Sequence, residues 1–246
     1  MQTLKRLYRS DYAGENVITN LTLVDGDWDP DAEYVPSQVS NSYTTSHAIA
    51  IGNGQSRRAF NLIHIANHSG GLLASDKLQS YGCNAVYRDS PVDFLIATSD
   101  AIVDEIAASG YTANNIVYAH AEAVLKYPGQ FYLMPQNMYL DAGSLAAYMA
   151  CFDGHKKVFL IGYDQYEEPT RQNNIYAGTN GYPAPSQIDN GEFFVRSLSS
   201  VMQTYSDVEF IRVMPFTNEW AHPSFTQLVN FRQINYRDFV IEADIG

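Results

Sequence analysis

The amino-acid sequence predicts an α/β domain with a mostly parallel sheet flanked by helices. From His47 onward, short apolar runs typical of buried strands alternate with stretches that carry a helical period, and this alternation is the pattern of βαβ units. Residues 1–46 carry no sustained period and many polar residues. We therefore expect an irregular N-terminal extension over 1–46 and one main domain over 47–246, because a chain of 246 residues can bury one sizeable core.

The predicted elements follow one another in a regular order. Strands are expected where apolar and β-branched residues gather, at 48–52, 84–87, 92–98, 115–118, 130–134, 157–162 and 208–213. Helices are expected at 56–68, 100–109, 144–152 and 190–205. The last helix has an apolar face and can be capped by Asp189 or Asn190. The segment 163–189 is too long for a simple connection, and its Tyr, Asn and Gly content favours a binding loop.

Composition and charge exclude several classes of protein. The formal net charge of −12 argues against a nucleic-acid partner, because recognition of a phosphate backbone relies on Lys and Arg. No apolar run approaches the roughly 20 residues of a membrane span, and the polar N-terminus lacks the apolar segment of a secretory signal. Cys83 and Cys151 have no metal-ligand spacing, which fits free thiols in a reducing compartment. We expect a soluble cytoplasmic protein with no metal site.

The segment IAIGNGQS at 49–56 is the first candidate for a ligand site, because it passes from an apolar run through a small-residue turn into a helical pattern. Gly52 and Gly54 would let the backbone approach a ligand without obstruction by a Cβ atom. Ser56 can cap the helix that follows, and the free N–H groups of that helix favour an anion. The turn therefore predicts a nucleotide site.

Two further segments are expected to meet this turn. Gly143 and Ser144 open a second predicted helix, and the segment 162–166 leaves the next strand. In an open α/β sheet, ligands bind at the carboxyl ends of the strands. A diphosphate or a sugar nucleotide could then lie between the positive ends of two helix dipoles.

The motifs IGNGQS, GCNAVYRD, AGSLAAYMACFDGHKKVFLIGYDQY and NNIYAGT carry a resemblance to a known family. In this order they resemble the bacterial sialyltransferases of glycosyltransferase family 42 and the related archaeal 6-hydroxymethylpterin diphosphokinases, which share a Rossmann-like fold. The resemblance covers about residues 48–215 and leaves the N-terminal extension unexplained.

The resemblance implies a role for particular residues. Asn53 and Asn84 would contact the nucleotide, and the turn at Gly143 and Ser144 would bind its phosphate or ribose. Tyr166 and Tyr176 would correspond to the paired tyrosines that donate hydrogen bonds to the leaving phosphate, where negative charge develops.

The sequence departs from the family pattern at two points. Gln55 replaces a proline in the glycine turn, and the catalytic histidine expected before the late helix is missing, since the segment 182–189 contains none. Asp189 could act as a base in its place, although it can equally be a helix cap.

Taken together, the residues and the resemblance lead us to expect a glycosyltransferase with a nucleotide-activated sugar as donor, of the CMP-sialic acid type, and an acceptor hydroxyl as the second substrate. No cofactor is expected. One alternative is a diphosphokinase of the pterin type, in which magnesium and ATP replace the sugar nucleotide and carboxylates such as Asp100 and Asp164 would hold the metal. A second is a nucleotide-binding or assembly module that kept the fold and lost the chemistry. The oligomeric state is left open, a homo-oligomer included.

Overall fold

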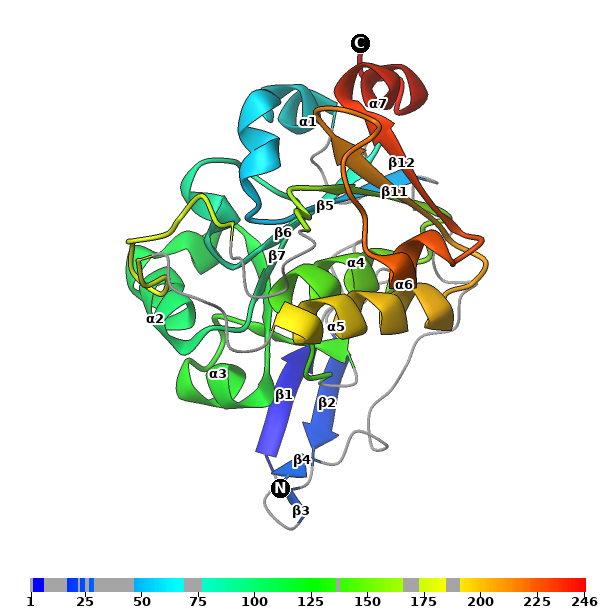
Figure 1. Cartoon of the computed structure of the whole chain (residues 1–246). Coiled ribbons are helices and arrows are strands. Elements are labelled where there is room, and N and C mark those ends of the chain that lie inside the picture. The colour runs from blue at the N-terminus through cyan, green and yellow to red at the C-terminus, as the bar shows by residue number, and fades with distance from the viewer. Residues whose placement is uncertain are drawn as a thin grey trace.

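A computed structural model of the chain describes residues 2–6, 17–21, 23–24, 27–28, 47–68, 77–135, 138–165, 173–184 and 191–246. Its centre is an eight-stranded sheet in which every neighbouring pair is parallel, so the predicted α/β class is confirmed (Figure 1). The strands are β5 (His47–Ile51), β6 (Gln79–Cys83), β7 (Phe94–Ala97), β8 (Ile116–Ala119), β9 (Tyr132–Leu133), β10 (Lys157–Ile161), β11 (Glu209–Met214) and β12 (Phe231–Asn235).

The order of the strands creates one reversal of direction across the sheet. The order is β12-β11-β10-β5-β6-β7-β8-β9, so the chain first builds outward from β5 to β9 and then returns to add β10 on the other side of β5. The register pairs His47 with Lys157 and Ile51 with Ile161, and the carboxyl ends of β5 and β10 are therefore level. Such a reversal is where doubly wound sheets form a ligand crevice.

Helices cover both faces of the sheet (Figure 1). On one face lies α4 (Ala142–Phe152), which contacts β5, β6, β7 and β10 and is itself covered by α5 (Gly191–Thr204). The opposite face carries α1 (Ile63–His68) and α7 (Tyr236–Glu242), where the ring of Phe239 packs against Phe60 and Phe159. The remaining helices are α2 (Asp100–Ser109), α3 (Ala121–Lys126) and α6 (Pro223–Thr226), with 3-10 turns η4 (Gln55–Ala59), η5 (Asn84–Arg88) and η6 (Tyr111–Ala113).

Two local predictions are wrong. The helix predicted at 56–68 is broken into η4 and α1, with Phe60 in an extended conformation between them. The strand predicted at 84–87 is η5, and the strand of this unit is β6, five residues earlier. Gln79 and Ser80 are the first two residues of β6, and both are fully buried. Because both are polar, the sequence lacks the apolar run that predicts a buried strand at this position.

The N-terminal segment contains two antiparallel strand pairs that the lack of a period did not predict. β1 (Gln2–Arg6) pairs with β2 (Val17–Leu21), and β3 (Leu23–Val24) pairs with β4 (Asp27–Trp28). β1 lies close to β9 and α3 (Figure 1). Among the described residues, none of the helices has the length and apolar character that crossing a membrane requires.

Candidate functional site

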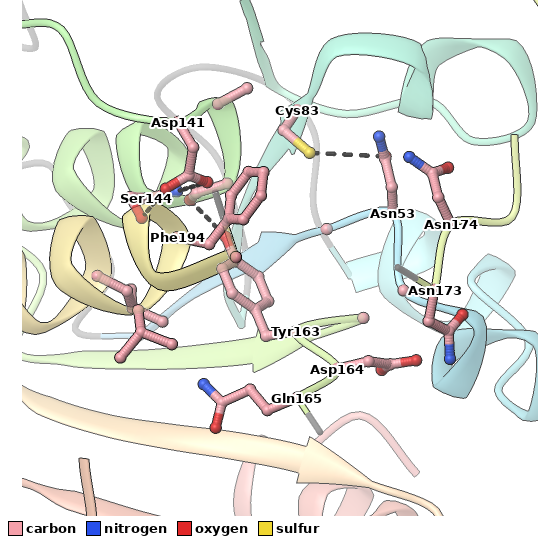
Figure 2. Close-up of a pocket in the computed structure, with 18 of the residues that line it drawn as sticks. Asn53, Cys83, Asp141, Ser144, Tyr163, Asp164, Gln165, Asn173, Asn174 and Phe194 are labelled. Atoms are coloured by element: carbon pink, nitrogen blue, oxygen red, sulfur yellow. Dashed lines mark hydrogen bonds between the residues drawn. The ribbon is translucent and has the colours of Figure 1, made fainter. Parts of the chain in front are cut away.

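A cavity of about 370 Å³ lies at the carboxyl ends of β5 and β10, at the reversal of the strand order (Figure 2). The loops after both strands, the start of α4, one side of α5 and the segment before α6 form its walls. Six of the seven binding residues predicted from the sequence line it, namely Gly52, Asn53, Gly54, Asn84, Gly143 and Ser144. The seventh, Ser56, does not.

The glycines of the turn are needed for contact between two loops. Gly52 N–H donates to the carbonyl of Ile161 and Gly54 N–H to the carbonyl of Gly162, each at 2.8 Å. A Cβ atom on Gly54 would lie 2.5 Å from the carbonyl oxygen of Gly162 and 2.6 Å from the carboxylate of Asp164. The close approach that we predicted for a ligand is therefore made here by the loop after β10.

The N–H groups at the start of η4 are occupied by side chains. Ser56 N–H donates to Asp164 Oδ2 at 2.9 Å, its hydroxyl donates to Asp164 Oδ1, and Gln55 N–H donates to Asn173 Oδ1 at 3.0 Å. Ser56 lies inside η4 and the capping position is Gly54, which has no side-chain cap. The predicted Ser56 cap is thus wrong, and an anion at this turn would have to displace a protein carboxylate.

A carboxylate also occupies the start of α4. Asp141 is its N-cap: Oδ1 accepts from Ser144 N–H at 3.0 Å, and Oδ2 accepts from the hydroxyl of Ser144. The phenol of Tyr163 donates to the carbonyl of Gly143 at 2.6 Å and closes this side of the cavity. Burial raises the pKa of the Asp141 carboxyl above its usual value, and the hydrogen bonds from Ser144 oppose that rise.

Asn53, Asn84 and Tyr182 form a polar cluster on the opposite wall. Asn53 Nδ2 donates to the phenol oxygen of Tyr182 at 2.9 Å, and Asn53 Oδ1 accepts a weak bond from the thiol of Cys83 at 3.6 Å. Asn84 has a φ of 45° and accepts at Oδ1 from Thr98 N–H at 2.9 Å. Burial raises the pKa of Tyr182, so its hydroxyl stays protonated and can donate.

Tyr176 is placed outside the cavity lining. It is buried, and its phenol accepts from Arg57 Nη2 at 2.6 Å and donates to Asp89. The guanidinium of Arg57, itself 3% exposed, also lies 5.6 Å from the centre of the Tyr176 ring. Tyr166 and Asp189, the other two residues predicted to be catalytic, lie outside the described residues.

Cations from two 3-10 turns fasten the loop segment 173–184 to the domain. Arg58 Nη2 donates to the carbonyl of Ile175 at 3.3 Å. Arg88 donates to Thr179 Oγ1 at 2.8 Å and to the carbonyl of Asn180 at 3.0 Å, while it forms an ion pair with Glu105. The same Arg88 lowers the pKa of Glu105 to about 2. This anchoring brings Tyr182 to the cavity.

Sequence reasoning missed several aromatic or titratable residues of the cavity, among them Tyr182 and His222. His222 is the N-cap of α6: its Nδ1 accepts from Ser224 N–H at 3.1 Å, and its own N–H donates to Gln165 Oε1 at 3.0 Å. Because Nδ1 accepts, the proton of the neutral ring is on Nε2, which can then only donate. The position of His222 directly before Pro223 was a sequence signal that could have indicated a helix N-cap here.

The cavity is acidic. Its described lining includes the carboxylates of Asp141, Asp164 and Glu192 and contains no Lys or Arg. The rest of the lining is amide, hydroxyl and aromatic, with Phe194 and Trp220 partly exposed. The arrangement offers neutral hydrogen-bond donors and flat apolar faces to a ligand.

Comparison of the chain with protein-family models, with curated proteins and with solved structures gives no match. The fold and the chemistry of the cavity are therefore the features that bear on function.

Proposed function

We propose that the protein is a glycosyltransferase that binds a nucleotide-activated sugar in the cavity at the ends of β5 and β10. The observation that carries this proposal is the meeting of Asn53, Asn84, Gly143 and Ser144 around one cavity at the reversal of the strand order. The reversal is the usual place for a nucleotide in a doubly wound sheet. The amides of the two asparagines suit the edges of a base or a ribose.

The charges of the cavity favour a donor with few negative charges. A nucleoside monophosphate linked to a sugar brings fewer charges beside Asp141 and Asp164 than a nucleoside triphosphate does, and like charges repel strongly where water is scarce. Both carboxylates line the cavity. The charges of the cavity therefore favour a donor of the CMP-sugar type over ATP without a magnesium ion.

Two neutral donors are suited to the leaving phosphate. The phenol oxygen of Tyr182 accepts from Asn53, which leaves its proton for an acceptor in the cavity. The Nε2 proton of His222 is fixed by the bond that Nδ1 accepts from Ser224. Donors of this kind stabilise the charge that develops as the bond between sugar and phosphate breaks.

We propose for Tyr182 the role that the resemblance gave to Tyr176. The hydroxyl of Tyr176 is engaged by Arg57 and Asp89, whereas Tyr182 lines the cavity. The rings of the two tyrosines stack at 5.9 Å. Tyr166 remains a prediction.

A thermal-shift screen tests the proposal, because a ligand that binds the native state raises its apparent stability. The ligands are CMP, UMP, UDP and ATP, each with and without magnesium. We expect CMP or UMP to raise the melting temperature without a metal, and Tyr182→Phe to weaken that shift. A shift with ATP and magnesium alone would replace the proposal with the kinase, and no shift with any nucleotide would contradict it.

Turnover is then measured as hydrolysis of the corresponding sugar nucleotide. We expect Tyr182→Phe to lower the rate by about 10²–10³-fold, the usual cost of one donor to a developing anion. Phe216→Ala is the matched control, since this exposed aromatic residue lies outside the described cavity linings. Binding of the nucleotide without turnover would favour a module that has lost the chemistry.

A further inference from the structure

A second cavity, of about 590 Å³, adjoins the first at the carboxyl ends of β6, β7 and β8. The two cavities share part of their lining, namely Asn84, Asp141, Ala142, Tyr182 and Phe194. The shared residues include a carboxylate and a phenol at the boundary. The two cavities therefore meet along this shared wall, and they are called the two compartments below.

The second cavity has an aromatic wall. The ring of Tyr139 stacks on His120 with centroids 4.5 Å apart and planes 17° apart, yet 63% of Tyr139 is exposed. Its hydroxyl is held by Glu122 Oε1 at 2.8 Å, which fixes the ring. Phe194, shared with the first cavity, is 43% exposed. Fixed, exposed aromatic faces of this kind suit the flat C–H faces of a sugar ring, because both surfaces bury apolar area on contact.

The acidic side chains of this cavity accept hydrogen bonds and give it negative charge. Asp100, Glu122 and Asp141 contribute carboxylates, and its described lining contains no Lys or Arg. Carboxylates accept strong hydrogen bonds from hydroxyl groups. An acidic sugar would be repelled here, whereas an uncharged one would not.

We propose that the second cavity is the acceptor site and that it takes an uncharged carbohydrate, with Asp141 at the boundary as the base that receives the proton of the acceptor hydroxyl. This inference rests on the proposed function. Asp141 lines both compartments, so its carboxylate lies between a sugar donor in one and an acceptor in the other. It would fill the role left vacant by the histidine that the family pattern has and this sequence lacks.

The reaction balances without a further reactant. The acceptor oxygen forms a bond to the anomeric carbon of the donor sugar, and the bond from that carbon to the phosphate oxygen breaks. The electron pair of the broken bond stays on the phosphate, and the hydroxyl proton passes to Asp141, which later releases it to water. Burial raises the pKa of Asp141, which makes its carboxylate a better base than an ordinary aspartate.

Binding of sugar alone tests the site independently of nucleotide chemistry. Saturation-transfer NMR with lactose as the neutral probe and glucuronic acid as the acidic probe reports binding to the full chain. We expect lactose to bind more tightly than glucuronic acid, with about a tenfold loss of lactose affinity in Tyr139→Ala and none in Phe216→Ala. Absence of lactose binding, or binding that Tyr139→Ala leaves unchanged, would overturn the inference.

The role of Asp141 is tested by Asp141→Asn, because asparagine is also a good N-cap and should preserve α4. We expect nucleotide binding to remain and transfer of sugar to lactose to fall by about 10²–10⁴-fold, the range for loss of a general base. Transfer at the wild-type rate would overturn this role. If lactose binds but the nucleotide screen fails, the proposed function fails and the second cavity remains a carbohydrate site.

Discussion

The carboxylate of Asp164 accepts the backbone N–H of Ser56 at 2.9 Å and thereby joins the loop after β10 to the loop after β5. The hydroxyl of Ser56 donates to the same carboxylate. The two loops thus form one wall of the cavity, although 108 residues separate Ser56 from Asp164 in the chain.

The bond between these loops can be measured by a double-mutant cycle. We expect Asp164→Ala to lower the free energy of unfolding by about 1–3 kcal/mol, because it leaves a partly buried N–H and hydroxyl unsatisfied. Ser56→Ala should cost less, and the double variant should show a coupling of about 0.5–3 kcal/mol in urea denaturation. Strictly additive losses would mean that the pair does not stabilise the wall.

A side chain at Gly54 should destabilise the protein, for a steric reason alone. Its φ of −64° suits alanine, but the Cβ atom would lie 2.5 Å from the carbonyl oxygen of Gly162. We expect Gly54→Ala to cost about 1–3 kcal/mol, as overpacking does. Gly110→Ala is the contrast, since its φ is 75° with nothing within 4 Å of a Cβ atom, and it should cost about 1 kcal/mol of backbone strain. Equal stabilities of wild type and Gly54→Ala would refute the close contact.

Substitution of Tyr176 should affect mainly stability, whereas substitution of Tyr182 should affect mainly function. Tyr176→Phe removes one of the two partners of the buried Arg57 Nη2, which also donates to Asp89 Oδ2 at 3.3 Å. It also removes the hydroxyl that donates to Asp89, so we expect a loss of about 1–3 kcal/mol in unfolding free energy. Tyr182→Phe keeps the ring and should affect ligand binding and turnover more than stability. Both variants are compared by urea denaturation and by the nucleotide thermal shift. If Tyr176→Phe is as stable as wild type but has impaired turnover, Tyr176 would be the residue that donates to the leaving phosphate.

The raised pKa of Asp141 predicts a dependence of stability on pH. The native state binds the proton of the Asp141 carboxyl more tightly than the unfolded chain does. At low pH, where the carboxyl is protonated in both states, its burial therefore does not lower the free energy of unfolding. The cost grows as pH rises from the ordinary value of 3.8 through the raised native pKa. Asp141→Asn should therefore be more stable than wild type at neutral pH, and the difference should vanish in acid.

Asp104→Asn provides a control of opposite sign. Hydrogen bonds from Lys126 and Tyr127 lower the pKa of Asp104, so this carboxylate contributes stability at neutral pH and loses it as pH falls. Urea denaturation of both variants across pH measures the two trends. A stability difference for Asp141→Asn that does not change with pH would contradict the buried charge.

The parallel sheet could be predicted because β5 and β10, two neighbouring strands near its centre, carry continuous apolar runs. Ala48, Ile49 and Ile51 of β5 are fully buried, as are Val158 and Leu160 of β10, and continuous apolar runs mark strands covered on both faces. β12, with the sequence FRQIN, is an edge strand with one buried position. Its mixed polarity gave no strand signal, and α7 was missed with it.

The candidate site could be predicted only where it lies at the end of a predicted strand or the start of a predicted helix. Asn53 lies two residues after the end of β5, and Ser144 lies in the first turn of α4. Tyr182 reaches the cavity because Arg88 holds its loop, and His222 because Gln165 accepts from its N–H. The contact between Arg88 and the loop of Tyr182 joins residues far apart in the chain and leaves no local pattern in a sequence, whereas His222 directly before Pro223 was a local signal.

The anchoring of the loop segment 173–184 has a consequence for how the cavity responds to salt. Arg58 and Arg88 are engaged by the protein's own carbonyls, hydroxyl and carboxylate. Ions in solution weaken partly exposed attractions of this kind. Salt would then weaken ligand binding indirectly, by loosening the segment that carries Tyr182. The sensitivity of ligand binding to ionic strength would depend on the protein's internal charges more than on the charges of the ligand.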